Sequence, residues 1–408
     1  MTAQEIPEYA FANPRGDLLS PAYHSLRRRS PVARVVTATG EPAWYVTSYQ
    51  HCLAVLRDPR FSLSQTHAAE GVPQRDEIRF PPIGANTMNR LSEAGLRDEF
   101  MRHVGPGQTA VPMDWVRSTA REQLDRMRMS GQPADLLSEW ANPVIFAVAR
   151  RLLGLPEADD EVFVEMVEKD LCMGDYSTAD RLANLEHLQR YMRRYLDRPR
   201  EEPAGMLDDL VDAQRRVLDS RGGADGLVPL TDDEFMDLAG FLLISAVANP
   251  AGLLTVGALV LLEHPEVARR LSEHPEEVPH AVEELLRSTV TMGGGLGRIA
   301  TEDVELGGVT VRRGELVLVV TDAANHDPDV FAEPDRFDID RERASTHLKF
   351  GGGRHYCPAS HLSRAVAAAA FEVLLAEMPA LRLAVPPTDL EWVPDRYVQL
   401  PRQLPVIW

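Results

Sequence analysis

The sequence is short of lysine, and this shortage bears on both partners and origin. Lys169 and Lys349 are the only lysines among 43 basic residues, and 62 acidic residues bring the formal net charge to −19. Such a charge disfavours a nucleic-acid partner and an anionic membrane surface. The preference for arginine, with abundant Ala, Gly and Pro, is typical of a GC-rich genome, so we expect an actinobacterial source.

Cysteine is also scarce. Cys52, Cys172 and Cys357 are odd in number and far apart, a spacing that fits neither a disulfide framework nor a zinc site. A reducing compartment suits such a chain. Met1 to Pro14 has no basic region followed by an apolar stretch, so we expect no signal peptide and a cytoplasmic protein.

One stretch lacks charge altogether. Leu238 to Leu262 contains no charged residue and is long enough to cross a bilayer. However, Asn249-Pro250 interrupts its middle and acidic residues flank both ends, whereas a spanning helix usually has basic residues on its cytoplasmic side. The stretch therefore predicts a buried central helix in a large soluble protein, with no membrane partner.

The remaining patterns predict a helical body with a smaller β-rich region. Val32–Thr37 and Ala43–Ser48 form a predicted hairpin, and Tyr49–Asp58 follows as a helix. From Trp115 to about Leu218 the pattern is almost wholly helical. Thr231, with Glu234 three residues on, predicts a capping box for the long apolar helix.

The last third of the chain changes character. More helix is expected over Pro265–Arg287, then ordered coil from Asn325 to Lys349 and a final helix from about Pro358 to Glu377. Short strands are expected at Arg298–Val304, Gly308–Val311 and Leu316–Val320. With no repeat or linker, residues 1–408 are predicted to form a single domain that is mainly α with a smaller β-rich region, an α+β class.

The strongest motif is the segment Phe350-Gly351-Gly352-Gly353-Arg354-His355-Tyr356-Cys357-Pro358, called the cysteine loop below. Its glycines suit a tight turn and a close approach to a flat ligand. Pro358 suits a first helical position, where the helix dipole favours a thiolate at Cys357. Taken alone, a cysteine after a glycine turn is more often a buried structural residue than a ligand.

The loop resembles the haem-binding loop of the cytochrome P450 family, whose pattern is Phe, two residues, Gly, three residues, Cys, one residue, Gly. Phe350, Gly353 and Cys357 match, and Ala359 replaces the last glycine. The resemblance implies the cytochrome P450 fold and haem b (iron protoporphyrin IX), with Cys357 as axial ligand of the iron. It places Phe350, Gly351 and Ala359 against the haem.

The same resemblance implies roles for other charged residues. Glu284 and Arg287 match the family's buried Glu-x-x-Arg pair, and Arg336 matches the arginine that joins it from the later coil. Arg298 resembles the arginine that binds a haem propionate, and His355 resembles its usual partner. Charge-assisted hydrogen bonds to a carboxylate suit both side chains.

Two positions depart from the family pattern. The usual His-x-x-x-Arg propionate pair is absent near residues 94 to 102, where Arg97, Arg102 or His103 could substitute. On the long helix, the family's acid and threonine are replaced by Ala248 and Asn249. Those groups help deliver protons during oxygen activation, and an amide cannot give up a proton at neutral pH.

Residues that line the substrate pocket follow from the resemblance alone. The segment after Arg287 is expected to pass the haem edge, and Ala248 on the long helix is a further candidate. The expected lining residues are Thr291, Met292, Gly294 and Val398.

The leading interpretation is an oxidoreductase, a monooxygenase or atypical oxidase of a specialised metabolite. The substrate would be a small or carrier-bound molecule, and electrons would come from NAD(P)H through a ferredoxin reductase and a ferredoxin. Two alternatives stay open. The departures also suit an inactive partner protein that stabilises another biosynthetic enzyme, such as a glycosyltransferase. A haem isomerase or a peroxide-driven enzyme would need no redox partner.

Overall fold

The structure is a computed structural model, and its description covers most of the chain. The described residues are 15–37, 39–67, 73, 82–107, 110–156, 165–166, 177–198, 205–219, 226–291, 294–393 and 398–408. They divide into two compact units, each described by itself: residues 1–86 with 283–357, and residues 87–282 with 358–408. That residues 1–408 form one domain stays a prediction.

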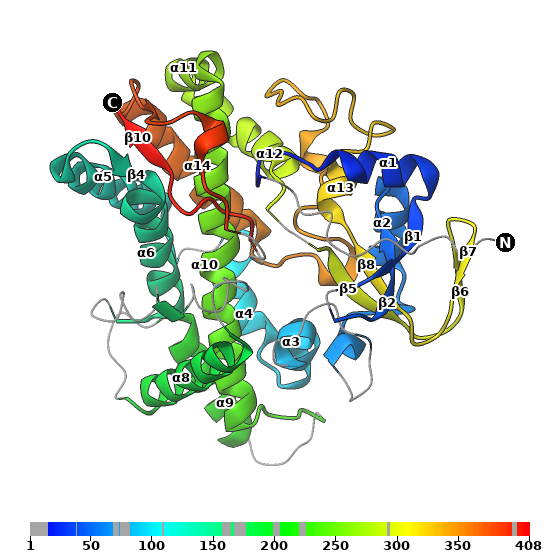
Figure 1. The fold of residues 1–408 in the computed structure, drawn as a ribbon. Helices are drawn as coiled ribbons and strands as arrows, with labels where there is room; N and C mark the ends of the chain where they lie inside the picture. Colours follow the sequence, from blue (N-terminus) through cyan, green and yellow to red (C-terminus); the bar gives the residue numbers. More distant parts are fainter. Residues whose placement is uncertain are drawn as a thin grey trace. The chain divides into compact units, whose positions relative to one another are not determined.

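The first unit is built on a mixed sheet of five strands in the order β1-β2-β8-β5-β3 (Figure 1). β2 and β8 are parallel, and the other neighbouring strands are antiparallel. β6 and β7 form a separate hairpin. The strands of the first unit are β1 Val32–Val36, β2 Pro42–Val46, β3 Phe61–Ser62, β5 Leu296–Ala300, β6 Val304–Leu306, β7 Val309–Val311 and β8 Leu316–Val319.

The helices of the first unit are short, and α3 and α12 cross its boundaries. They are α1 Pro21–Arg29, α2 Tyr49–Arg57, η1 Ser64–His67, α3 Pro82–Glu93, α12 Val278–Ser288, α13 Thr321–Asn325, η5 Ala344–Thr346 and η6 Gly353–His355.

The predicted hairpin and the helix after it are confirmed as β1, β2 and α2. The strand predicted over Arg298–Val304 is wrong in its extent, because the sheet strand ends at Ala300 and a second strand begins at Val304. The chain turns between these two strands, and the backbone N–H of Thr301 donates a hydrogen bond to Arg60 O at 2.8 Å.

The second unit is almost wholly helical, with one small sheet in the order β4-β10-β9. Its helices are α4 Arg97–Val104, α5 Met113–Ser130, η2 Leu137–Ala141, α6 Asn142–Leu153, α8 Thr178–Asp197, α9 Met206–Asp219, α10 Asp232–Glu263, α11 Pro265–Glu273, η4 Pro275–Glu277, α14 Ser360–Glu377 and η7 Pro387–Asp389. Its strands are β4 Ala134–Asp135, β9 Arg382–Leu383 and β10 Pro405–Ile407.

The long apolar helix, α10, is the axis of the second unit. It packs against α6, α8 and α14, while α14 also packs against α5 (Figure 1). The helix is long and apolar enough to cross a membrane, but 78% of its most apolar 18-residue window is buried within the protein. The predicted capping box is present, since Thr231 Oγ1 accepts from Glu234 N at 3.2 Å and Glu234 Oε2 accepts from Thr231 N at 2.9 Å. The interruption predicted at Asn249-Pro250 is wrong, because one continuous helix includes Pro250.

Candidate functional site

The cysteine loop lies in the first unit and is shaped by its glycines. Gly351 and Gly353 both adopt positive φ, +74° and +63°. At Gly353 a side chain would also overlap the carbonyl oxygen of Leu56 and stand 3.1 Å from Cα of Arg57. Glycine is therefore required at position 353 both by backbone conformation and by the close approach of the end of α2.

The backbone closes this loop on itself. Cys357 N donates to Phe350 O at 3.0 Å, so the two ends of the matched motif are hydrogen-bonded to each other. The Phe350 ring packs edge-on against Tyr356, with centroids 6.2 Å apart. Cys357 is half-buried, whereas Cys52 is a buried free thiol on α2. Cys172 lies outside the described residues.

The expectation that Pro358 occupies a first helical position is wrong. Pro358 and Ala359 form a turn, and α14 begins at Ser360, three residues after Cys357. Ala359 is the N-cap residue of that helix and gives no side-chain cap. Proline suits a turn as well as a first helical position, so the sequence alone does not distinguish the two.

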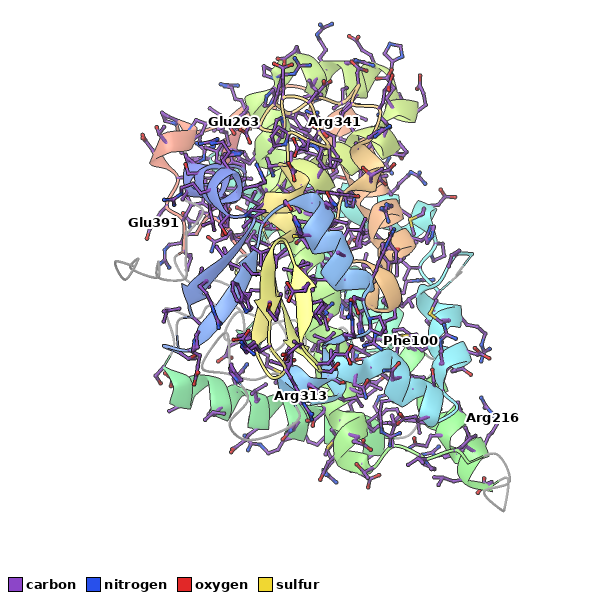
Figure 2. All side chains as sticks on the ribbon, turned by 90° about the vertical axis from the view of Figure 1, so that its right-hand side faces the viewer. Phe100, Arg216, Glu263, Arg313, Arg341 and Glu391 are labelled. Carbon is purple, nitrogen blue, oxygen red and sulfur yellow. The ribbon has the colours of Figure 1, made fainter. Side chains whose placement is uncertain are left out.

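A buried ion-pair network supports the coil that leads to the loop. Arg287 bonds Glu284 in a bidentate manner, with Nε–Oε2 and Nη2–Oε1 both at 2.7 Å. Arg341 Nε donates to both carboxylate oxygens of Glu284 at 3.1 Å (Arg341, Figure 2). Glu284 and Arg287 are fully buried. The two helical residues therefore form the predicted pair.

The third member of this network was predicted wrongly. Arg336 is 58% exposed and pairs with Glu333 and Asp338 at the surface. Its backbone carbonyl does accept from the network, at 2.8 Å from Arg341 Nη2. The coil turns so that Arg341, five residues after Arg336, supplies the buried guanidinium. The order of residues along the chain does not reveal which of the two arginines points inward.

Arg298 and His355 lie in the same unit, and neither has an acidic partner among the residues that the structure describes. Arg298, on β5, is 3% exposed, and within the described part of the chain its side chain donates only to Gly297 O, at 2.7 Å. His355 Nε2 is buried with no hydrogen-bond partner among the described residues. Burial and the nearby Arg354 lower the pKa of Arg298 to about 10. Burial, then Arg298 and Arg354, lower the pKa of His355 to about 4.

This arrangement fits a bound anion. Three groups able to carry positive charge gather beside the cysteine loop, and no carboxylate among the described residues neutralises them. Buried cations are normally paired. A haem propionate has the charge and the acceptor oxygens that Arg298 and His355 Nε2 require.

The second unit holds the positions that depart from the family pattern. Ala248 is buried and Asn249 is exposed, both on α10. Neither side chain is ionisable. Val398 is fully buried in this unit. Of the other predicted lining residues, Thr291 is buried and Gly294 has φ +80° in the first unit, whereas Met292 lies outside the described residues.

The possible substitutes for the missing propionate pair lie on α4, and two of them already have partners. Arg102 pairs with Glu99, and His103 Nε2 lies 3.1 Å from Asp209 Oδ2 on α9. Arg216 of α9 also reaches Glu99, at 3.3 Å (Arg216, Figure 2). Glu99, His103 and Asp209 are close enough together to hold a metal ion. However, the charges of Arg102 and Arg216 offset those of Glu99 and Asp209, so the cluster has no net negative charge to attract a cation.

Arg97 differs from its two neighbours on α4. It is exposed and makes no ion pair among the described residues. Of the three candidates for a propionate ligand, it is the one with a free guanidinium.

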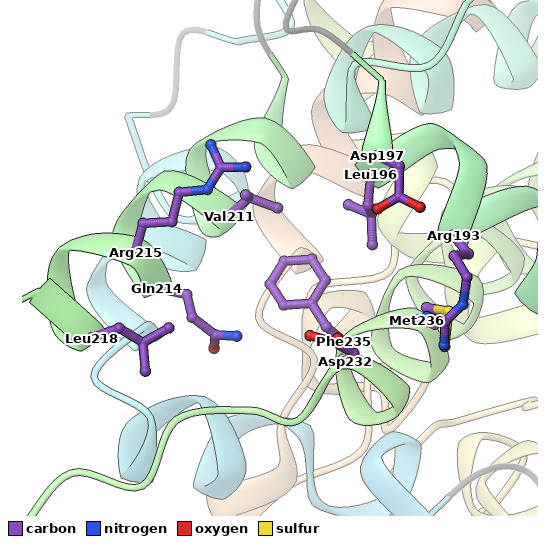
Figure 3. A pocket seen from close by; sticks show the side chains of 10 residues that line it. All are labelled: Arg193, Leu196, Asp197, Val211, Gln214, Arg215, Leu218, Asp232, Phe235 and Met236. Carbon is purple, nitrogen blue, oxygen red and sulfur yellow. The ribbon is translucent and has the colours of Figure 1, made fainter.

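A separate pocket of about 270 Å³ opens between α8, α9 and the start of α10 (Figure 3). Its apolar lining comes from Leu196, Val211, Leu218, Phe235 and Met236. Its two arginines already have partners, since Arg193 lies 3.2 Å from Asp233 and Arg215 lies 3.4 Å from Asp212. The pocket contains none of the residues predicted to bind the cofactor or substrate.

Comparison with known proteins gives these features a common explanation. The chain is 36% identical to mycocyclosin synthase of Mycobacterium tuberculosis, over 100% of both chains. It belongs to the cytochrome P450 family. The family model described as Cytochrome P450 matches residues 177–378. Mycinamicin IV hydroxylase/epoxidase of Micromonospora griseorubida is 35% identical, again over 100% of both chains.

Solved structures agree. The LnmA cytochrome P450 hydroxylase from the leinamycin biosynthetic pathway of Streptomyces atroolivaceus superposes with a TM-score of 0.80 at 33% identity, covering 99% of this chain and 100% of that one. The predicted α+β cytochrome P450 fold is thus confirmed, as is the assignment to a family of haem-thiolate enzymes. The chain is an enzyme, and its family's cofactor is haem.

Proposed function

We propose that this P450 is an oxidase of a specialised metabolite in which Cys357 is the axial thiolate ligand. Two groups beside the loop carry the proposal: Arg298 is a buried cation with no acidic partner among the described residues, and His355 Nε2 is a buried atom with no hydrogen-bond partner there. We assign them to a haem propionate. Bound haem supplies the activation of oxygen. The Glu284–Arg287–Arg341 network keeps the coil before the loop in place.

The departures on α10 define what is unusual in this enzyme. Neither Ala248 nor Asn249 can release a proton at neutral pH, so protons reach the reacting centre from water or from a substrate hydroxyl. Asn249 can still orient such a group, because its amide both donates and accepts hydrogen bonds. Chemistry less dependent on proton delivery, such as coupling or dehydrogenation, suits this arrangement.

The relatives support a proposal for the class of substrate. The relatives described above are named for mycocyclosin, mycinamicin and leinamycin, which supports a specialised metabolite, small or carrier-bound, as substrate. Thr291, Met292, Gly294 and Val398 are proposed to line the pocket. Electrons are proposed to come from NAD(P)H through a ferredoxin reductase and ferredoxin in the cytoplasm. Exposed Arg354 on the cysteine loop offers a positive contact for an acidic ferredoxin.

The test begins with the reduced carbon monoxide complex of the purified protein. A thiolate-type Soret band is expected, and Cys357→Ser abolishes it. Cys52→Ala is the matched control, since Cys52 is a buried thiol on α2 that donates to Val46 O at 3.2 Å. Loss of the band in both variants, or its survival in Cys357→Ser, contradicts the assignment. Substrate-induced spectral titration against natural products then identifies the substrate class.

A further inference from the structure

Lys349 is a buried lysine immediately before the cysteine loop. Its Nζ donates to Thr289 O at 2.6 Å and lies 3.3 Å from Asp322 Oδ1. The side chains of Lys349 and Asp322 are 9% and 1% exposed. Burial lowers the pKa of Lys349, which Asp322 opposes. Burying two charges is costly, and such a pair is often no more stabilising than apolar residues.

The pair joins three segments of the first unit. Thr289 directly follows the end of α12, which carries Glu284 and Arg287, and Asp322 lies on α13. Leu348, the residue before the lysine, donates its N–H to Asn325 Oδ1 of α13 at 2.6 Å.

The chain is therefore held at two successive residues just before Phe350. Phe350 O is the atom that accepts the N–H of Cys357. The contacts of Leu348 N and Lys349 Nζ therefore help to hold the Phe350 carbonyl oxygen in place. A compact ammonium with three donors can satisfy a carbonyl and a carboxylate from different directions, which a planar guanidinium does less readily.

We propose that Lys349 and Asp322 are positioning residues for the thiolate ligand: their buried ion pair holds the Phe350 carbonyl where it receives the Cys357 N–H, and their opposite charges tune the reduction potential of the haem. The inference rests on the proposed role of Cys357. It adds a role for two residues that lie outside the matched motif.

Three variants test the inference: Lys349→Met, Asp322→Asn and the double variant. Removing a nearby positive charge disfavours the reduced haem, and removing a negative charge favours it. The equilibrium reduction potential is therefore expected to fall in Lys349→Met and to rise in Asp322→Asn. Each single variant also loses part of the thiolate-type band in the reduced carbon monoxide complex, because one charge stays buried without its partner.

The double variant separates electrostatics from folding. Removing both charges together leaves neither unpaired, so a folded protein with a potential near that of the unmodified enzyme is expected. Its thiolate-type band should still be diminished, because the contacts of Lys349 with Thr289 O and Asp322 that hold the chain before Phe350 are gone. Arg343→Met, which removes an exposed positive charge six residues upstream, is the control and leaves the potential unchanged because solvent screens that charge.

The outcomes distinguish two kinds of failure. Shifts of the same sign in both single variants, or shifts no larger than in Arg343→Met, overturn the inference even if the unmodified enzyme shows a thiolate-type band. If Lys349→Met does not fold, a fall of the potential in Asp322→Asn, or a rise no larger than the change in Arg343→Met, overturns the inference. Absence of that band from the unmodified enzyme instead overturns the proposed function.

Discussion

Arg341→Met tests the ion-pair network at the residue that the structure, and not the sequence, identifies. The guanidinium donates to both oxygens of Glu284 and to the carbonyls of Ala332, Glu333 and Arg336. Methionine keeps an unbranched apolar side chain but supplies none of these donors. Removing one partner of a buried pair typically costs about 3–5 kcal/mol. Because Arg287 still neutralises Glu284, we expect the lower end, about 3 kcal/mol.

Arg336→Met is the matched control. It is the same substitution five residues away, but the Arg336 side chain is exposed and its network contact is made by its backbone carbonyl. Exposed ion pairs contribute little to stability, so we expect no clear change. The buried carbonyl remains available to Arg287 and Arg341.

Urea unfolding of both variants, followed by circular dichroism and by haem absorbance, measures the difference. The midpoint should fall clearly in Arg341→Met at an unchanged slope, and haem should be lost at lower urea concentration than in Arg336→Met. Equal destabilisation by the two substitutions, or a larger effect at Arg336, would refute the assignment of the buried role to Arg341.

Three further predictions concern the loop, its histidine and α10. Gly353→Ala should lower the free energy of unfolding by more than the roughly 1–2 kcal/mol of a left-handed alanine, because the new Cβ also meets Leu56 O. Gly314→Ala is the control: its φ is +85°, but the new Cβ would have no neighbouring atom within 4 Å, so it should cost only the backbone strain. Equal urea midpoints for the two variants would contradict this. The pKa of His355, about 4, lies below the ~6.5 of an unfolded histidine, so the unfolded chain binds this proton first as pH falls. The haem-free protein should therefore have its full stability above pH ~6.5 and lose stability as pH falls from there toward 4. His355→Gln should weaken this dependence in urea titrations, and an unchanged pH profile would count against it. Asn249→Thr should change product distribution or the coupling of electrons to product, measured by product yield per NAD(P)H, and identical turnover would argue against a modified proton route.

Much of the fold follows from local patterns. Alternation in the first hairpin, the capping box at Thr231 and the uncharged run of α10 each have a physical cause within a few residues. The cysteine loop was identified for the same reason, since its glycines and cysteine are contiguous. The start of α14 was misplaced because proline suits both a first helical position and a turn.

The sequence by itself determined the cysteine loop, the helical class and the buried character of α10, since each depends on residue types at short spacing. Only the tertiary structure decided that Arg341 rather than Arg336 reaches Glu284, and that Arg102 and His103 already have partners. It also revealed the buried partner of Lys349. These pairings join residues far apart in the chain or within irregular coil, where no periodicity fixes which side chain points inward.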